Sequence, residues 1–288
     1  MKNKEKKNIK RSFEKFIYIL GMVFFLTVFL ACAIYLLKYL FENKKSENKV
    51  EDLRQLIKED SSPNKTEDNN KNDIENEGNI DSYPEIEFVL VNGIEVQKKF
   101  EELYRLNNDF VGWISIEDTV IDYPVMYSSY DREYYLHRDF DKEYNGAGSI
   151  FIDTASSLNP ESDNILVYGH NMKTGTMFHS LLDYEDEEFY NDHKFISFDT
   201  IYGNGTYEVI AAFRTSIYPS GYSGFKYYHF FNADNSYEFD EYVTNCKKLT
   251  PYNIETSAKY GDKLLSLSTC AYHSDNGRFV VVAKKISE

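Results

Sequence analysis

An uncharged apolar run near the N-terminus limits the possible fold more than any other feature of the sequence. From Phe16 to Leu37 the chain reads FIYILGMVFFLTVFLACAIYLL, without one charged side chain. A helix rises about 1.5 Å per residue, so a run of this length crosses a bilayer core of about 30 Å. We therefore predict a transmembrane helix over residues 16–38, which separates the rest of the chain from a short N-terminal tail.

Charge around this run predicts its orientation. Residues 1–15 carry seven Lys or Arg against two Glu, which predicts a basic cytoplasmic tail with everything C-terminal of the helix outside the cell. Two alternatives concern Ala31-Cys32-Ala33, which resembles a signal-peptidase site and contains a candidate lipoprotein cysteine. The apolar run continues past Ala33, and the residues before Cys32 fit a lipoprotein site poorly, so an uncleaved anchor is favoured.

The remainder of the chain is acidic and poor in cysteine. Of the 32 Lys and Arg and 47 Asp and Glu in the sequence, 25 and 45 follow the basic tail. This balance argues against a nucleic-acid partner, because phosphate needs cationic contacts. Outside the membrane only Cys246 and Cys270 remain, whereas a small disulfide-stapled scaffold would carry more. We expect a fold held by its core, with Cys270 free; the sequence assigns Cys246 no role.

Residues 39–84 are predicted to be a juxtamembrane segment and linker. Val50, Leu53 and Leu56 recur at helical spacing and favour a helix within Glu42 to Lys58. From Glu59 to Ser82 two isoleucines are almost the only large apolar side chains. Such a stretch cannot bury enough surface to offset chain entropy, which indicates a flexible, charged spacer.

Residues 85–288 are expected to form one mostly-β domain. Many short apolar or alternating runs separated by turn residues favour a barrel or sandwich. The runs are VGWISI, VIDYPVMY, GSIFID, NILVYGH, TYEVIAAF, KLLSLST and RFVVVAKKI. Three helices are predicted beside them: one on the apolar positions Val96, Phe100, Leu103 and Leu106, one from Met177 to Asp192, and one from Ser236 to Leu249.

The stretch LSLSTC carries a candidate nucleophile. Strand alternation places Leu265 and Leu267 on one face, and Ser266, Ser268 and Cys270 on the other. The leucine face should be core, so Cys270 is expected to end its strand on an open face. Ser268 shares that face and could contact a peptide bound there.

The pairing of the last two strands decides where Arg278 lies. A tight turn at Asn276-Gly277 would pair Asp275 with Arg278 and turn the guanidinium away from the cysteine face. A longer loop, Ala271 to Gly277, pairs Cys270 directly with Arg278 on the same face. We favour the longer loop because AYHSD is a poor continuation of a buried strand.

A cysteine nucleophile needs a nearby imidazole, since the thiolate is the reactive form. His170 follows a glycine at the end of the buried run NILVYG, a position suited to the rim of a cleft. His273 is its competitor because it lies close to Cys270 in sequence. A structural or solvated role is the better interpretation for the other histidines, namely His137, His179, His193 and His229.

Other cysteine and metal enzymes do not fit this arrangement. A tyrosine-phosphatase loop needs a shorter spacing than the eight residues between Cys270 and Arg278. A papain-like protease has its cysteine before its histidine, the reverse of the order here. No CxxC pair or HExxH motif is present to indicate a zinc site.

Together these motifs resemble a class B sortase from about Asn107 to Ile286. The resemblance rests on GWISI with IDYPV, YYLHRDF followed by GSIFID, NILVYGHNM, and LSLSTC with RFVVVAKKI. Ser266 stands where threonine is common in the family. The resemblance implies a closed β-barrel of about eight strands with flanking helices, here preceded by the transmembrane helix.

The resemblance also implies roles for individual residues. Cys270 is expected to be the nucleophile, His170 the acid and base, and Arg278 the stabiliser of the reacting carbonyl. Leu136 aligns with a position that packs on the substrate proline. Tyr227, or Tyr222 in its place, lies in the segment where sortases carry a loop that reads the substrate.

The implied activity is transpeptidation at the surface of a Gram-positive cell. The enzyme would cleave a C-terminal sorting motif, NPQTN-like or PxTG-like, after Thr, and transfer the acyl group through a thioacyl intermediate to a cell-wall peptide or lipid-linked amine. The expected partners are surface proteins that carry the motif, and no metal or organic cofactor is expected. The alternatives are a pilin-polymerising sortase, a surface cysteine protease that only hydrolyses, and a non-enzymatic adhesion module.

Overall fold

The computed structural model describes residues 2–60 and 86–287. The chain divides into two compact units, Met1–Lys49 and Val50–Glu288, and each is described by itself. Most of the predicted acidic spacer, Glu59 to Ser82, lies outside the described residues and stays a prediction.

The first unit is the greater part of one helix, α1 (Lys2–Asp60). Within it, Lys15–Lys58 contains a stretch that is long and apolar enough to cross a membrane, with a mean hydropathy of 2.6. It is the one candidate membrane span in the described part of the chain. The predicted membrane-spanning residues are therefore helical, and the helix continues unbroken through the predicted juxtamembrane segment.

The second unit includes the last turns of α1. Leu53 is 2% exposed and belongs to a buried cluster with Phe100 and Tyr135. Arg54 donates a hydrogen bond to the carbonyl of Asp122 and forms an ion pair with its carboxylate. The spacing of the apolar residues predicted this helix but not its packing against the domain that follows.

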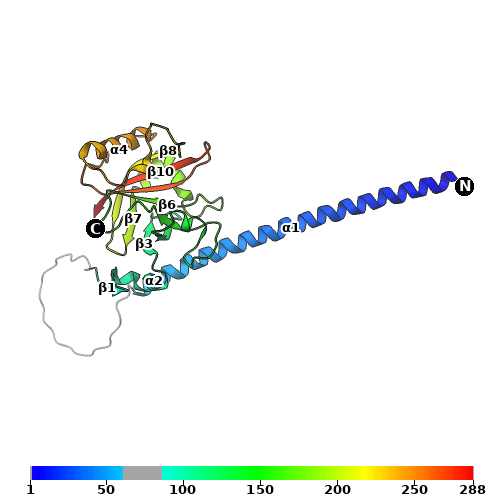
Figure 1. Cartoon of the computed structure of the whole chain (residues 1–288), viewed down its shortest axis with the longest axis horizontal. Helices are drawn as coiled ribbons and strands as arrows, with labels where there is room; N and C mark the ends of the chain where they lie inside the picture. Colours follow the sequence, from blue (N-terminus) through cyan, green and yellow to red (C-terminus); the bar gives the residue numbers. More distant parts are fainter. Residues whose placement is uncertain (1, 61–85, 288) are drawn as a thin grey trace, which may run out of the picture. The chain divides into compact units, whose positions relative to one another are not determined.

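Eight strands of the second unit close into a barrel in the order β10-β8-β7-β3-β4-β5-β6-β9 (Figure 1). The neighbours β4 and β5, and β6 and β9, are parallel, and the other pairs are antiparallel. The prediction of a closed barrel is confirmed. The strands are β3 (Phe110–Ser115), β4 (Asp122–Met126), β5 (Ile150–Ile152), β6 (Asn164–Tyr168), β7 (Phe195–Thr200), β8 (Thr206–Ser216), β9 (Leu264–Cys270) and β10 (Gly277–Ser287).

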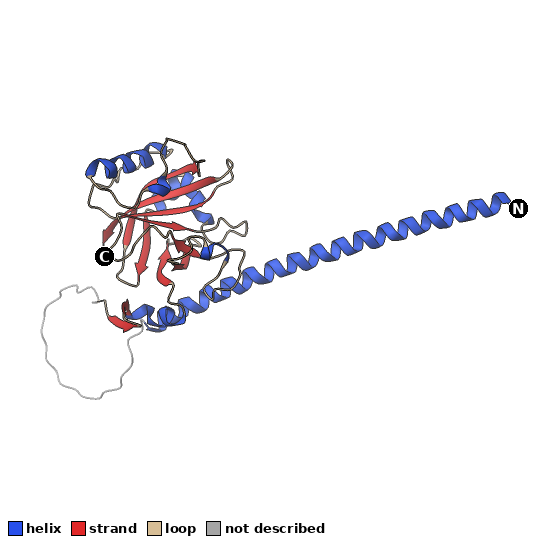
Figure 2. Ribbon diagram, viewed as in Figure 1, coloured by secondary structure: helices blue, strands red, loops and turns tan. Residues whose placement is uncertain are grey.

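Short helices and a separate hairpin flank the barrel (Figure 2). Helix α4 (Ser236–Leu249) is confirmed with the predicted bounds and packs against β8. The remaining elements are β1 (Phe88–Val91), β2 (Ile94–Gln97), η1 (Lys98–Phe100), α2 (Glu101–Leu106), η2 (Tyr134–His137), η3 (His179–Glu185), α3 (Glu187–Asp192), η4 (Tyr227–His229) and α4 (Ser236–Leu249).

Two of the predicted helices differ from the structure for local reasons. Val96 lies in β2 because Asn92-Gly93, both with positive φ, forms the tight turn of a hairpin. The helix predicted from Met177 to Asp192 is two elements, η3 and α3. Asp186 separates them, since its side chain accepts from the Glu188 amide and caps the start of α3.

The two faces of β9 are both covered, which corrects one prediction. Leu265 and Leu267 lie in the barrel core, as predicted. Ser266 and Ser268 were expected on an open face, but both are buried. Tyr242 of α4 hydrogen-bonds Ser266 at 3.0 Å, so α4 covers this face and leaves it open only near its end.

Candidate active site

Cys270 and Arg278 lie side by side at the ends of two neighbouring strands. Cys270 is the last residue of β9 and pairs directly with Arg278 near the start of β10. The amide of Ala271 donates to the carbonyl of Gly277 at 3.0 Å and closes the connecting loop. The longer-loop register is therefore confirmed. The thiol of Cys270 is free and partly exposed.

His170 reaches the same end of the barrel from β6. Strands β6 and β9 run parallel, and Tyr168 pairs with Ser268. Two residues beyond these partners stand His170, just past the end of β6, and Cys270, the last residue of β9. The parallel pairing of two strands that are far apart in sequence thus brings the imidazole to the thiol.

Side-chain hydrogen bonds hold the two strand ends together. Thr269 Oγ1 donates to the carbonyl of Gly169 at 2.8 Å, and Asn171 Nδ2 donates to the carbonyl of Cys270 at 3.0 Å. Asn171 Oδ1 pairs at 2.7 Å with Nδ1 of His179, which therefore has a structural contact here. The residues on both sides of His170 are fixed relative to β9.

Gly169 allows this close approach. A Cβ at this position would lie 2.5 Å from Cδ1 of Ile150 and 2.7 Å from the ring of Phe178. Any larger side chain would push the backbone before His170 away from the barrel.

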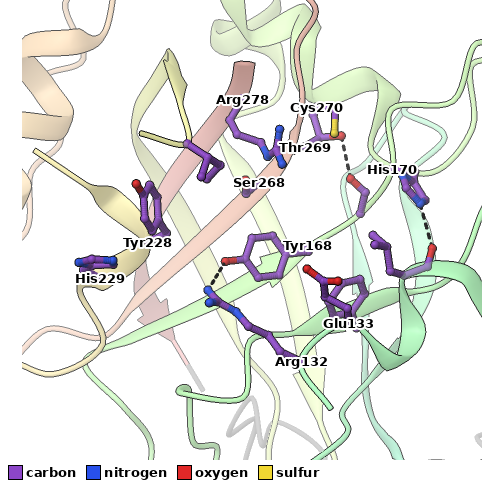
Figure 3. Close-up of a pocket in the computed structure, with 14 residues that line it drawn as sticks. Arg132, Glu133, Tyr168, His170, Tyr228, His229, Ser268, Thr269, Cys270 and Arg278 are labelled. Carbon is purple, nitrogen blue, oxygen red and sulfur yellow. Dashed lines mark hydrogen bonds between the residues drawn. The ribbon is translucent and has the colours of Figure 1, made fainter. Parts of the chain in front are cut away.

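One groove of about 320 Å³ joins the three residues. Cys270, His170 and Arg278 all line it, whereas His273 does not (Figure 3). The groove has the size of a small-ligand or peptide subsite. The structure thus brings together the candidates from three separate strands and separates the competing histidine from them.

The hydrogen bond of His170 defines its tautomer. Nε2 lies 2.9 Å from the carbonyl oxygen of Leu136. A carbonyl can only accept, so Nε2 carries the proton and Nδ1 is left to exchange protons in the groove. Burial lowers the pKa of His170, as do the charges of His137 and Arg278, while the bond to Leu136 opposes the shift. The neutral imidazole is therefore the favoured form.

Two of the three residues predicted to contact the substrate line the groove. Leu136 and Ser268 both line the groove. Tyr227 does not; it is 1% exposed, and its hydroxyl hydrogen-bonds Ser268 at 2.7 Å. From the segment between β8 and α4, the side chains of Ile217, Tyr228 and His229 line the groove.

The alternative in this loop, Tyr222, does not line the groove either. It is exposed, and its ring stacks on that of Tyr218 with centroids 4.0 Å apart.

Sequence reasoning missed the far end of the groove. Arg132, Glu133 and Tyr168 line it there, and Arg132 Nη2 donates to the Tyr168 hydroxyl at 3.1 Å (Figure 3). Arg132 Nε and the Tyr168 hydroxyl both donate to the buried carboxylate of Asp153 at 2.9 Å. Tyr168 lies two residues before His170, so strand alternation could have placed it on the same side. No sequence pattern pointed to Arg132, because its partner Asp153 lies 21 residues further along the chain.

Comparison with protein families and curated proteins agrees with this geometry. The family model described as the sortase domain matches residues 114–286. Sortase B of Staphylococcus aureus (strain NCTC 8325 / PS 47) is 34% identical over 193 residues, which are 66% of this chain and 76% of that protein. Sortase B of Listeria monocytogenes serovar 1/2a is 36% identical over 202 residues, 69% of this chain and 78% of that protein.

Solved structures of similar fold include three sortases B. A Staphylococcus aureus sortase B–substrate complex has a TM-score of 0.60 at 34% identity and covers 67% of this chain and 86% of its own. Sortase B of B. anthracis in complex with AAEK1 has a TM-score of 0.60 at 30% identity, covering 72% and 91%. Sortase B of Clostridium perfringens has a TM-score of 0.56 at 31% identity, covering 65% and 99%.

Proposed function

The chain belongs to class B of the sortase family and is a cysteine transpeptidase, and on that premise we propose that Cys270, His170 and Arg278 carry out its reaction. The observation that supports these roles best is the meeting of the three side chains in one groove, from the ends of β6, β9 and β10.

In the first half of the reaction Cys270 forms a thioester with the substrate. The thiolate attacks the carbonyl carbon of the threonine before the scissile bond, and the carbonyl π electrons move onto oxygen. Arg278 stabilises this oxyanion by charge-assisted hydrogen bonds. When the tetrahedral intermediate collapses, the imidazolium of His170 gives its Nδ1 proton to the departing amine. The C-terminal fragment leaves, and a thioacyl-enzyme remains.

In the second half an amine takes the place of the departed fragment. The incoming amine attacks the thioester carbonyl, and neutral His170 accepts its proton at Nδ1. Collapse of the second tetrahedral intermediate expels the Cys270 thiolate and forms the new amide bond. The enzyme returns to its starting protonation state, because one proton has been given and one taken.

The low pKa of His170 has a consequence for this cycle. Burial favours the neutral imidazole, so the thiolate–imidazolium pair is a minor form of the free enzyme. Because the active ion pair is a minor form, the rate of the overall reaction is lowered. The imidazolium of His170 nevertheless gives up its Nδ1 proton readily, which suits a group that must act first as an acid and then as a base.

We further propose the substrate, partners and placement. The enzyme binds a sorting motif of the NPQTN or PxTG type on surface proteins, with Leu136 against the motif proline and Ser268 near its backbone. The acceptor is an amine of a cell-wall peptide or its lipid-linked precursor. Residues 16–38 anchor the chain, with residues 1–15 in the cytoplasm and the catalytic domain, residues 85–288, outside.

Transfer to an amine tests this proposal. The purified enzyme is incubated with quenched peptides containing either motif, with and without triglycine, and the products are identified by mass spectrometry. We expect cleavage after threonine, a peptide–triglycine product, and loss of both with Cys270→Ala. Hydrolysis that added amine does not divert would instead indicate a cysteine protease, and full activity of the Cys270→Ala variant would exclude the proposed nucleophile.

A further inference from the structure

The short helix η2 holds the imidazole of His170 on two sides. The carbonyl oxygen of Leu136 accepts the Nε2 proton at one edge of the ring, at 2.9 Å. The ring of the next residue, His137, stacks on a face of His170, with centroids 5.5 Å apart and planes 22° from parallel. His137 is exposed and does not line the groove, so it does not touch a bound substrate there.

We propose that His137 is a positioning residue that keeps the His170 ring oriented for proton transfer at Nδ1, and that a positive charge on His137 disfavours the protonated form of His170. The proposal rests on the proposed function of His170 and adds a second imidazole to it. It assigns an effect on the reaction to a histidine whose sequence context indicates only a structural or solvated role.

The contacts around His170 favour a positioning role for His137. The backbone at His170 is already fixed, because Thr269 bonds the carbonyl before it and Asn171 bonds the carbonyl of Cys270. The bond from Nε2 to Leu136 fixes one edge of the ring, yet the ring can still rotate about the line through that bond. A flat partner on its face opposes that rotation. Loss of the stack would let Nδ1 turn away from the sulfur, and small misplacements of this kind are costly in catalysis.

Several charged or titratable side chains lie near the rings of His170 and His137. Arg278 of β10 and Cys270 of β9 share the groove with His170, as do Glu133, Arg132 and His229. The ring of Tyr144 also lies near His137, at 6.3 Å between centroids. The next residue along the chain, Arg138, has its guanidinium over the ring of Tyr134.

Two cations therefore act on His170 from different sides. The charges of His137 and Arg278 both lower the pKa of His170, in addition to burial. A positive charge on His137 thus disfavours the imidazolium at His170, and removal of His137 should raise the pKa of His170.

The test compares two variants of different shape. His137→Ala removes both the stack and the charge, while His137→Phe keeps a flat ring and removes only the charge. The matched control is His193→Ala, which removes a histidine stacked on Phe189 at 3.9 Å outside the groove. For each protein, kcat and KM for peptide transfer are measured from pH 5 to 9, together with the melting temperature.

Positioning predicts a loss of kcat and not of substrate binding. His137→Ala should lower kcat by about tenfold with little change in KM, and His137→Phe should restore most of it. In both variants the acid limb of kcat/KM should move to higher pH, because the positive charge that lowers the pKa of His170 has been removed. His193→Ala should match the wild type in both respects.

Other results would overturn the inference. An unchanged kcat and pH profile in His137→Ala would do so, as would a change confined to KM or a loss of kcat in His137→Phe as large as in His137→Ala. If wild-type enzyme shows no transfer at all, the proposed function fails instead, so the two failures are distinguishable. The melting temperatures identify unfolding, and His137→Phe still tests the pH shift if His137→Ala is unstable.

Discussion

Arg278 is the residue whose chemistry most depends on the strand register. It pairs with Cys270 across β9 and β10, and one of its guanidinium nitrogens, Nη1, donates to the carbonyl of Gly277 at 2.9 Å. The other nitrogens are left to bind an oxyanion on the substrate carbonyl. This arrangement is reached only because the loop between the strands is long enough to put both side chains on one face.

Replacement of Arg278 should therefore slow catalysis more than it weakens binding. We expect Arg278→Ala to lower kcat by about 10²–10³, the usual cost of losing one oxyanion donor, and Arg278→Lys to retain part of the rate. The control is Arg214→Ala on β8, whose guanidinium pairs with Glu185 outside the groove. Steady-state kinetics with a quenched peptide measures both; an unchanged kcat in Arg278→Ala would exclude the stabilising role.

The depressed pKa of His170 has a consequence for stability. Its folded pKa is lower than the value of about 6.5 expected in the unfolded chain, so the unfolded state binds more protons below that pH. The contribution of His170 to stability is thus fully present above about pH 6.5 and is lost as the pH falls through its folded pKa.

A comparison with His170→Gln isolates this effect. The free energy of unfolding of both proteins is measured by urea denaturation at pH 7.5 and 5.5. We expect wild type to lose more stability than His170→Gln over this interval, because the glutamine does not titrate. An equal loss in the two proteins would contradict the lowered pKa.

Among the elements, the segment around η4 is fixed to the barrel by a buried polar chain. Asn164 Nδ2 donates to the carbonyl of Phe230 at 2.9 Å, and its Oδ1 accepts from Ser266 at 2.8 Å. Tyr242 of α4 continues the chain to Ser266. Three elements far apart in sequence therefore meet at Asn164, beside the segment that places Tyr228 and His229 in the groove.

Removal of this amide should affect both stability and binding. Asn164→Ala leaves buried partners unsatisfied, which costs about 1–3 kcal/mol in the free energy of unfolding. We also expect a higher KM, because the segment that lines the groove loses an anchor, with a smaller change in kcat. Asn191→Ala, an exposed amide on α3, is the control. A stable Asn164→Ala protein with unchanged KM would show that the chain has no such role.

The end of α1 is the second element with a testable role. Val50, Leu56 and Ile57 pack against the cluster that contains buried Leu53. These residues belong to the second compact unit even though the predicted catalytic domain begins at Glu85.

Truncation and substitution test this packing. Leu53→Ala should lower the free energy of unfolding by about 2–5 kcal/mol, the range for a buried leucine, while Leu53→Met should cost less because it nearly conserves volume. For the same reason a protein that starts at Val50 should melt at a higher temperature than one that starts at Glu85. Equal stability of the two truncated proteins would show that the packing is dispensable.

At the scale of the whole molecule, the sequence predicted most of the barrel and misjudged what covers it. Alternating runs identify strands, and β9 shows both the strength and the limit of this signal. Its leucines point into the core as predicted, but its serines are buried under α4, since alternation does not reveal what packs on the second face. Strand β7 was missed because FISFDT does not alternate regularly between apolar and polar residues.

The same limit applies to the site. Local patterns were enough to select Cys270, His170 and Arg278, since each stands at the end of a recognisable strand. Arg132 and His137 were not selected, because their importance comes from partners more than twenty residues away, Asp153 and His170. Short sequence patterns do not reveal contacts between residues that are far apart in the chain.

The bounds of α1 and β1 show which parts of the chain the acidic segment connects. Since α1 ends within the second unit at Asp60 and β1 begins at Phe88, the segment between them joins two parts of that unit. Only residues 39–49 connect the predicted membrane span to Val50.

The most direct test of the account is the intact mass of the enzyme trapped during turnover. Wild-type protein is mixed with a sorting peptide without added amine, quenched in acid, and analysed by mass spectrometry before and after proteolysis. We predict an adduct equal to the peptide fragment ending in threonine, attached to Cys270, and its disappearance when triglycine is added before the quench. An adduct on another residue, or cleavage of the peptide without any covalent intermediate in the wild-type enzyme, would contradict the proposed mechanism.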